Sequence, residues 1–293
     1  MVIAGGNTNE VEILIGNSIV NKRLPNLPDG TMCSLMFTHN TNMILFTNQK
    51  SKKCFKLDYS SWKYHSTLKR LRWASASVVS TNSATFIFGG FGSLFTYEYL
   101  PKNCITWKLG KTKIPGGFEY GCAIEVKSEQ EIWLIGGLST KRRILSFNIK
   151  DHSFKELSFK LAVDRGFGPR CAFIPGTNKV IVTGGADSDK SSEILDIVNG
   201  TVSISNPTNY LRSFHGIGDI SINGQERLAV FGGRSNNTSS SSYYRSIEVY
   251  DPDTQKWKRY NGIKLDKPRY ICRFLNVKLA DIYQSIIPKS AIS

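Results

Sequence analysis

The 293-residue chain contains no long apolar run. Its longest runs, such as Ala229-Val230-Phe231 ahead of a glycine pair, are far shorter than the ~20 apolar residues of a membrane-spanning helix. The start, Met1-Val2-Ile3-Ala4-Gly5-Gly6, has neither the charged region nor the long apolar stretch of a secretory signal. The sequence therefore predicts no membrane span and favours a cytoplasmic location, although secretion stays open.

Residues that carry catalysis or bind metals are also scarce. The six cysteines form no Cys-x-x-Cys pair, and the sequence has no phosphate-cradling glycine loop, zinc-finger spacing or Ser/His/Asp triad spacing. The four histidines fall in separate segments of the chain, at His39, His65, His152 and His215. We expect no catalytic residue, no metal site and no cofactor, and so a protein that is not an enzyme.

Acidic residues are few beside basic ones. The chain has 23 Asp and Glu against 38 Lys and Arg, a formal net charge of +15. Such a positive net charge gives no information about the fold, but it favours a binding partner that is anionic. A hydrophobic content of 40% with 11% aromatic residues excludes a chain that is disordered throughout.

A repeat is the strongest pattern present. Glycine pairs follow short β-rich runs five times, and Asn48 ends a sixth run that lacks the glycines. The last residues of these markers stand at positions 6, 48, 90, 137, 185 and 233, at intervals of 42, 42, 47, 48 and 48 residues. Alternating runs lie before and after each marker, turn residues separate them, and no segment has a sustained 3.6-residue period. The sequence predicts an all-β chain of four-stranded units.

These units resemble kelch repeats. The segment from Arg212 to Trp257 matches best, with Arg-x-x-His, strand–Gly-Gly and Tyr-Asp-Pro-Asp…Trp in order. The Gly-His and Trp-Asp dipeptides typical of WD40 repeats are absent. The resemblance implies a β-propeller, and the six markers imply six blades of four antiparallel strands.

The predicted propeller is a single domain over residues 1–281, followed by a tail at 282–293. Residues 270–277 should supply the innermost strand beside Val2-Ile3-Ala4 and so close the ring, which hides strand edges. Trp62, Trp107 and Trp257 recur at one position of the outer strands and are expected to be structural. The expected blades are 1–24 with 268–280, 29–64, 71–110, 118–158, 168–205 and 212–260.

One position of the predicted inner strands is occupied by Cys33, Ser75, Cys122, Cys171, His215 and Cys272. A ring of soft ligands would suit a metal, but strand side chains point toward neighbouring blades, and small buried residues are needed there. Cys33 and Cys54 lie two strands apart in one blade, beyond the ~7 Å limit for a disulfide. We expect packing residues and mostly free thiols, as in a reducing compartment.

Three glycosylation sequons begin at Asn199, Asn236 and Asn237. Such triplets arise often by chance, and no signal peptide accompanies them. The sequence leaves open whether any of them is used.

The basic excess falls on one predicted face. Loops after the second and fourth strands carry 24 Lys and Arg against 7 Asp and Glu, whereas the opposite loops carry 7 against 8. Loops on a rigid scaffold are where binding residues usually lie. The candidate binding residues are Lys52, Lys53, Lys69, Arg70, Arg72, Lys141, Arg142, Arg143, Arg170, Arg212, Arg234, Tyr243, Tyr244 and Arg269.

The leading functional hypothesis is a monomeric, non-enzymatic scaffold that binds an acidic peptide or protein on this face. The kelch resemblance implies the same, since kelch adaptors commonly read acidic peptides with arginines there. The alternative is a polyanion or glycan binder, including an anionic membrane surface or nucleic acid, although no nucleic-acid-binding fold is recognised. A galactose-oxidase-like enzyme is a further, less favoured reading, because this chain lacks the paired His and the Tyr–Cys crosslink of that enzyme's copper site.

Overall fold

The computed structural model describes most of the chain. The described residues are 2–5, 9–15, 18–21, 24–28, 35–40, 43–47, 51–58, 61–72, 76–185, 190–235, 243–269 and 272–275. The expected tail at 282–293, the side chain of Cys33 and the sequons at Asn236 and Asn237 lie outside these ranges. No helix among the described residues is long and apolar enough to cross a membrane.

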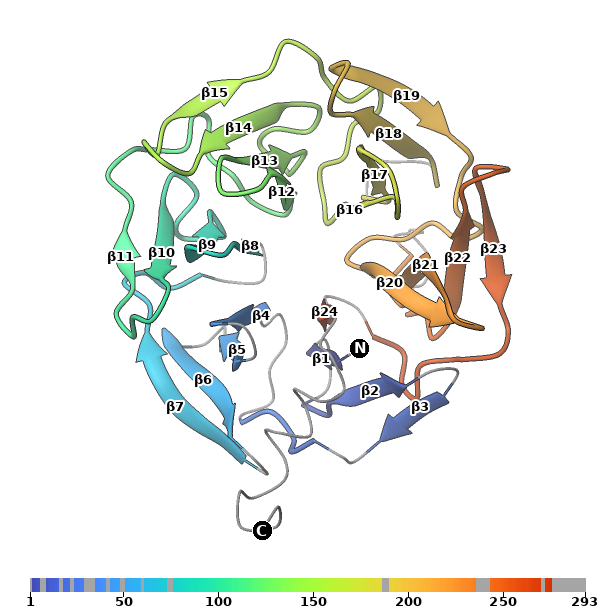
Figure 1. The fold of residues 1–293 in the computed structure, drawn as a ribbon, viewed down its shortest axis with the longest axis horizontal. Helices are drawn as coiled ribbons and strands as arrows, with labels where there is room; N and C mark the ends of the chain where they lie inside the picture. The colour runs from blue at the N-terminus through green and yellow to red at the C-terminus, as the bar shows by residue number, and fades with distance from the viewer. Residues whose placement is uncertain are drawn as a thin grey trace.

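The described residues form six four-stranded antiparallel sheets around a common centre (Figure 1). The first eleven strands in chain order are β1 (Val2–Gly5), β2 (Glu12–Ile15), β3 (Ser18–Asn21), β4 (Leu35–His39), β5 (Met43–Thr47), β6 (Lys53–Asp58), β7 (Ser61–Thr67), β8 (Ser77–Ser80), β9 (Ala84–Phe88), β10 (Tyr97–Pro101) and β11 (Lys108–Leu109). The remaining strands are β12 (Cys122–Lys127), β13 (Glu131–Ile135), β14 (Ile144–Asn148), β15 (Phe154–Glu156), β16 (Arg170–Phe173), β17 (Lys179–Thr183), β18 (Ser192–Asp196), β19 (Thr201–Ser205), β20 (Gly216–Ile222), β21 (Gln225–Phe231), β22 (Ile247–Asp251), β23 (Lys256–Tyr260) and β24 (Cys272–Leu275). The predicted all-β propeller with four-stranded blades is confirmed.

The chain ends meet in one sheet, with the strand order β24-β1-β2-β3. β24 pairs with β1 along its whole length, from Val2 opposite Leu275 to Gly5 opposite Cys272. The strand expected at 270–277 is therefore the innermost strand of the first sheet. The strand β7 runs to Thr67, three residues past the end that the sequence predicted for its blade.

The glycine pairs mark the exits of the second strands because the backbone there is left-handed. Gly89 has φ 60° and Gly90 has φ 100°, a region that L side chains rarely adopt. A Cβ on Gly89 would also lie 1.8 Å from the carbonyl oxygen of Phe118, in the loop leading to the next sheet. The pair thus lets consecutive sheets approach each other closely, which explains its recurrence.

The core lies between neighbouring sheets, and the outer-strand tryptophans take part in it. Trp107 is fully buried, and its Nε1 donates to Ser66 Oγ of the preceding sheet at 3.1 Å. Trp257 is buried in the same way, with its Nε1 3.1 Å from Ser192 Oγ. Trp62 is half-buried and donates to the carbonyl of Pro25. These side chains join sheets, as a structural role requires.

The expectation of mostly free thiols is wrong for one pair of cysteines. Cys122 on β12 and Cys171 on β16 form a disulfide, with their Cα atoms 6.0 Å apart. These strands are innermost in adjacent sheets, so their equivalent positions face each other. The pair considered from the sequence, Cys33 and Cys54, was expected within one sheet. Cys54 is a buried free thiol and Cys104 an exposed one. The cysteine pattern thus gives no support to a reducing compartment.

Alkylation should distinguish these cysteines. Burial raises the pKa of the Cys54 thiol to about 12, so hardly any reactive thiolate forms at pH 8. In native protein purified without reductant, iodoacetamide is expected to label Cys104 and spare Cys54, while Cys122 and Cys171 become reactive only after reduction. Peptide mapping by mass spectrometry checks this. Labelling of Cys122 in the unreduced native protein would contradict the disulfide.

Candidate binding face

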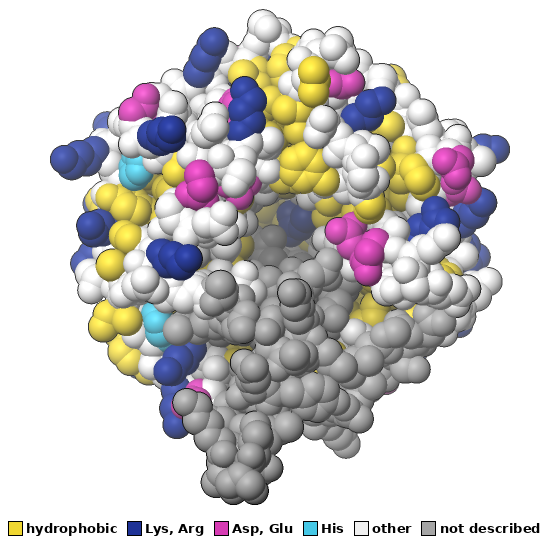
Figure 2. Space-filling model, viewed as in Figure 1, with side chains coloured by type: hydrophobic (Ala, Val, Ile, Leu, Met, Phe, Trp, Pro, Cys, Tyr) yellow, Lys and Arg dark blue, Asp and Glu magenta, His cyan; other side chains and the backbone are white. Residues whose placement is uncertain are grey.

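Successive loops of an antiparallel sheet emerge at alternate ends. We call "loop face" the end that carries the loops after the second strand of each sheet and those leading into the next sheet. Figure 2 shows one face of the molecule down the central axis, where Lys and Arg side chains lie among Asp and Glu around a central hollow. The described loops of the loop face are 9–11, 24–28, 51–52, 68–72, 89–96, 110–121, 136–143, 157–169, 184–185, 190–191, 206–215, 232–235, 243–246 and 261–269.

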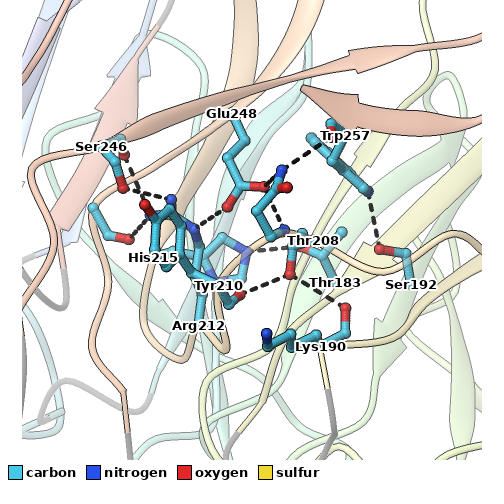
Figure 3. A network of polar contacts seen from close by, with 12 residues as sticks. Thr183, Lys190, Ser192, Thr208, Tyr210, Arg212, His215, Ser246, Glu248 and Trp257 are labelled. Carbon is cyan, nitrogen blue, oxygen red and sulfur yellow. Dashed lines mark hydrogen bonds and ion pairs between the residues drawn. The ribbon is translucent and has the colours of Figure 1, made fainter. Parts of the chain in front are cut away.

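Arg212 is a candidate binding residue that the structure places in the interior. Its side chain is fully buried, and its Nε lies 2.9 Å from Glu248 Oε1 (Figure 3). The guanidinium also donates to the carbonyls of Gly232 and Ser246, and Glu248 accepts the backbone N–H of Asn209. Burial lowers the pKa of Arg212, and the Glu248 carboxylate opposes that shift. The arrangement fixes an incoming loop on the third strand of the next sheet.

The same ion pair recurs in three other sheets. In each, an arginine ahead of the inner strand pairs with a glutamate on the third strand, at 2.6–3.1 Å. The further pairs are Arg72–Glu98, Arg165–Glu193 and Arg269–Glu12. All four arginine side chains are buried, and we call these pairs the clamps.

Four predicted binding residues are therefore corrected. Arg72, Arg212 and Arg269 belong to clamps and present no guanidinium at the surface. Arg170 is 9% exposed and donates to the carbonyl of Pro169. In the sequence these residues are indistinguishable from solvated loop arginines, because their glutamate and carbonyl partners lie in other strands and loops. Arg165 and the four glutamates were missed for the same reason.

Aromatic rings surround the Arg212 clamp on the loop face. Tyr244, a predicted site residue, packs against Tyr210 with ring centroids 5.0 Å apart and ring planes tilted by 38°, and Arg212 lies about 5 Å from both rings. Tyr243 is 39% exposed, and its backbone forms an isolated antiparallel β-bridge with Arg234, whose guanidinium lies 5.0 Å from the Phe214 ring centroid. Tyr243 thus reaches solvent, whereas the Arg234 guanidinium lies over an aromatic ring.

Lys141, Arg142 and Arg143 are already engaged with neighbouring groups. Arg142 is exposed, but its Nε donates to the carbonyl of Leu161 at 2.6 Å. Arg143 lies 2.9 Å from Glu156, and Lys141 lies 3.7 Å from Asp164. These contacts reduce the charge that this part of the loop face offers a partner.

Four other predicted residues come together as an exposed group. The backbone N–H of Leu68 donates to the carbonyl of Lys52 at 2.8 Å, which joins the loop before β6 to the loop after β7. Lys52 and Lys53 from the first segment and Lys69 and Arg70 from the second are all exposed. We call these four residues the basic cluster.

Next to the basic cluster lie three exposed apolar side chains that the sequence analysis did not single out. Leu71, Phe91 and Phe95 are 38%, 55% and 52% exposed. Ser93 Oγ donates to the carbonyl of Leu71 at 3.1 Å, so the loop with both phenylalanines lies against the Leu71 segment. We call these three residues the apolar patch. In the sequence, Phe91 directly follows the pair Gly89-Gly90 in a segment too short for another strand, which was a weak signal of its exposure.

The opposite face carries a polar hollow of about 310 Å³. Its lining includes His39, Lys102 and Glu125, together with Asn40 and Asn82. Burial lowers the pKa of the His39 imidazole and raises that of the Glu125 carboxyl, so both groups tend toward neutrality. Among the described residues no group of three or more His, Cys, Asp or Glu is arranged to hold a metal ion.

Comparison with known proteins agrees with this architecture. The family model described as "Kelch motif" matches residues 226–261, which confirms the kelch resemblance there. Of 413 matching chains in solved structures, one entitled "Structure of YjhT" has a TM-score of 0.68 and 13% identity over 82% of this chain and 85% of that chain. At that identity the likeness shows the fold alone. No curated protein matches the sequence.

Proposed function

We propose that this chain is a six-bladed kelch-type propeller that acts as a non-enzymatic interaction scaffold and binds an acidic peptide or protein on its loop face. The observation that carries the proposal is the basic cluster, in which Lys52, Lys53, Lys69 and Arg70 are exposed side by side. Within the described part of the chain, none of these four side chains forms an ion pair with a carboxylate, whereas Lys141 and Arg143 do. Clustered cations steer acidic partners, and an Arg–carboxylate contact adds bidentate geometry.

The alternative, a general polyanion binder, uses the same charges differently. Binding through counterion release weakens steeply as salt rises, whereas a partner with buried anchors keeps much of its affinity. The clamps favour the peptide reading, because they remove Arg72, Arg212 and Arg269 from the surface. The exposed charge is then carried by the basic cluster and by other cations such as Lys111 and Lys113, and not by the buried arginines.

Charge reversal tests the proposal. A fluorescein-labelled dodecapeptide of Glu, Ser and Gly serves as the probe, with binding followed by fluorescence anisotropy at two salt concentrations. Reversal of the basic cluster (Lys52→Glu, Lys53→Glu, Lys69→Glu, Arg70→Glu) is expected to weaken binding at least tenfold, because four attractive charges become repulsive.

The matched control reverses four exposed lysines at the opposite end of the sheets: Lys102→Glu, Lys150→Glu, Lys179→Glu and Lys256→Glu. It changes the net charge equally and is expected to weaken binding less than about threefold, since only the overall field is altered. Circular dichroism establishes that both variants fold. Equal losses in the two variants would refute a binding site at the basic cluster.

A further inference from the structure

The apolar patch has a fixed shape. Its loop contains two consecutive turns, with Ser93 N–H donating to Gly90 and Thr96 N–H donating to Ser93. The following loop pins it from the other side, since Ile114 N–H donates to the carbonyl of Phe95 at 2.9 Å and Phe118 N–H to that of Leu94 at 2.9 Å. Phe91 and Phe95, each about half exposed, therefore stand on a loop that is fixed by backbone hydrogen bonds. A partner that covers them does not first have to order the loop, which lowers the entropic cost of binding.

Cations border the apolar patch on two sides. The basic cluster continues directly into Leu71 through Arg70, and Lys111 and Lys113 are exposed in the loop that holds Phe95. The three segments that build this region, 68–72, 89–96 and 110–119, contain a single acidic residue, Glu119, which is buried. An occupant of the patch thus meets positive charge on either side and no exposed carboxylate from these segments.

From this complementarity we infer that the apolar patch receives the large apolar side chains of an acidic peptide segment, one in which Phe or Leu stands between Asp or Glu residues. The inference rests on the proposed function and specifies its ligand. The apolar side chains bury Leu71, Phe91 and Phe95, while the flanking carboxylates face the basic cluster on one side and Lys111 and Lys113 on the other. Contiguous exposed apolar surface rimmed by polar residues is typical of interaction sites.

A membrane surface fits this geometry less well. Insertion into a bilayer would call for apolar tips on several loops of the face, yet among the described loops of this face only Tyr243 adds another exposed large hydrophobic side chain. The apolar patch comes from one sheet and its entry loop. Its extent suits a short peptide better than a lipid surface.

Two fluorescein-labelled dodecapeptides of equal net charge provide the test. One contains Glu, Ser and Gly, and in the other Phe and Leu replace two of the serines. Because each buried apolar side chain adds hydrophobic stabilisation, the second peptide is expected to bind the wild-type protein at least tenfold more tightly. The variant Leu71→Ser/Phe91→Ser/Phe95→Ser should lose this advantage and bind the first peptide as the wild type does. Its control, Ile105→Ser/Val198→Ser/Ile204→Ser, removes apolar side chains that are more exposed and should retain the advantage.

The outcomes separate this inference from the proposed function. Equal affinity for the two peptides, with both weakened by reversal of the basic cluster, would overturn the inference and leave the proposed function standing. No binding of either peptide would overturn both. Cosedimentation with phosphatidylserine vesicles that is lost in the Leu71/Phe91/Phe95 variant would overturn the inference in favour of a membrane surface.

Discussion

Replacement of Arg212 by alanine is expected to lower the free energy of unfolding by about 3–5 kcal/mol, because it leaves a buried carboxylate without its charge partner. Glu248 would keep only its contacts with Asn209, and the carbonyls of Gly232 and Ser246 would lose a donor. At about 2–4 °C per kcal/mol for large domains, the melting temperature should fall by roughly 6–20 °C. Differential scanning calorimetry measures this change in melting temperature.

A double variant tests whether charge imbalance is the cause. In the sheet β12–β15, Leu145 stands at the β14 position that glutamate occupies in the clamped sheets, so an apolar residue is compatible with this place. Arg212→Leu/Glu248→Leu is therefore expected to be more stable than Arg212→Ala, since no buried charge is left unpaired. A single Arg212→Ala variant that loses less than about 1 kcal/mol would refute the structural role of the clamp.

The parts of the fold that could be predicted from the sequence are those set by local backbone requirements. Gly89 and Gly90 must be glycines because of their left-handed backbone and their closeness to the next sheet, so the repeat is visible in the residues themselves. The alternating runs between glycine pairs then give four strands per unit. The closing strand β24 followed from the same count, because the first sheet lacked one strand.

The sequence did not allow us to predict which arginines are buried. Loop arginines are usually exposed, and Arg269 meets its partner Glu12 across 257 residues of chain. A weak signal existed, because Glu98 and Glu193 each stand eight residues after a glycine pair. The disulfide was hidden for a related reason, since Cys122 and Cys171 belong to different repeats.

The candidate site was predicted only in part. Lys52, Lys53, Lys69 and Arg70 were identified by charge, and charge is a property that the sequence reports directly. The apolar patch was missed because Leu71, Phe91 and Phe95 look like core residues in composition, and only the three-dimensional structure gives their exposure. The charges in the sequence therefore indicated one face of the propeller. The exposure of individual side chains was needed to select the candidate site on that face.

Removal of the closing strand is expected to have the largest effect on stability. Truncation before Tyr270 deletes β24 and leaves the inner edge of β1 unpaired, with Val2 and Ile3 uncovered. Exposing two such side chains costs about 3–6 kcal/mol, to which the lost ladder of hydrogen bonds adds. An unpaired edge is also a template for association. We expect a melting temperature lower by more than 10 °C, and dimers or larger species in size-exclusion chromatography coupled to light scattering.

A second truncation isolates the contribution of the strand. Deleting residues 278–293 keeps β24 and the clamp between Arg269 and Glu12, so the difference between the two truncated proteins reports on the segment 270–277 alone. Because Arg269 remains in both, the clamp holds the chain end near β2 even where β24 is missing, and the shorter protein should unfold locally at the first sheet before the rest. Hydrogen exchange should show this as lost protection of β1 and β2 with protection of β13 and β17 retained. Full protection of β1 without β24 would mean that pairing with β24 does not hold the ring closed.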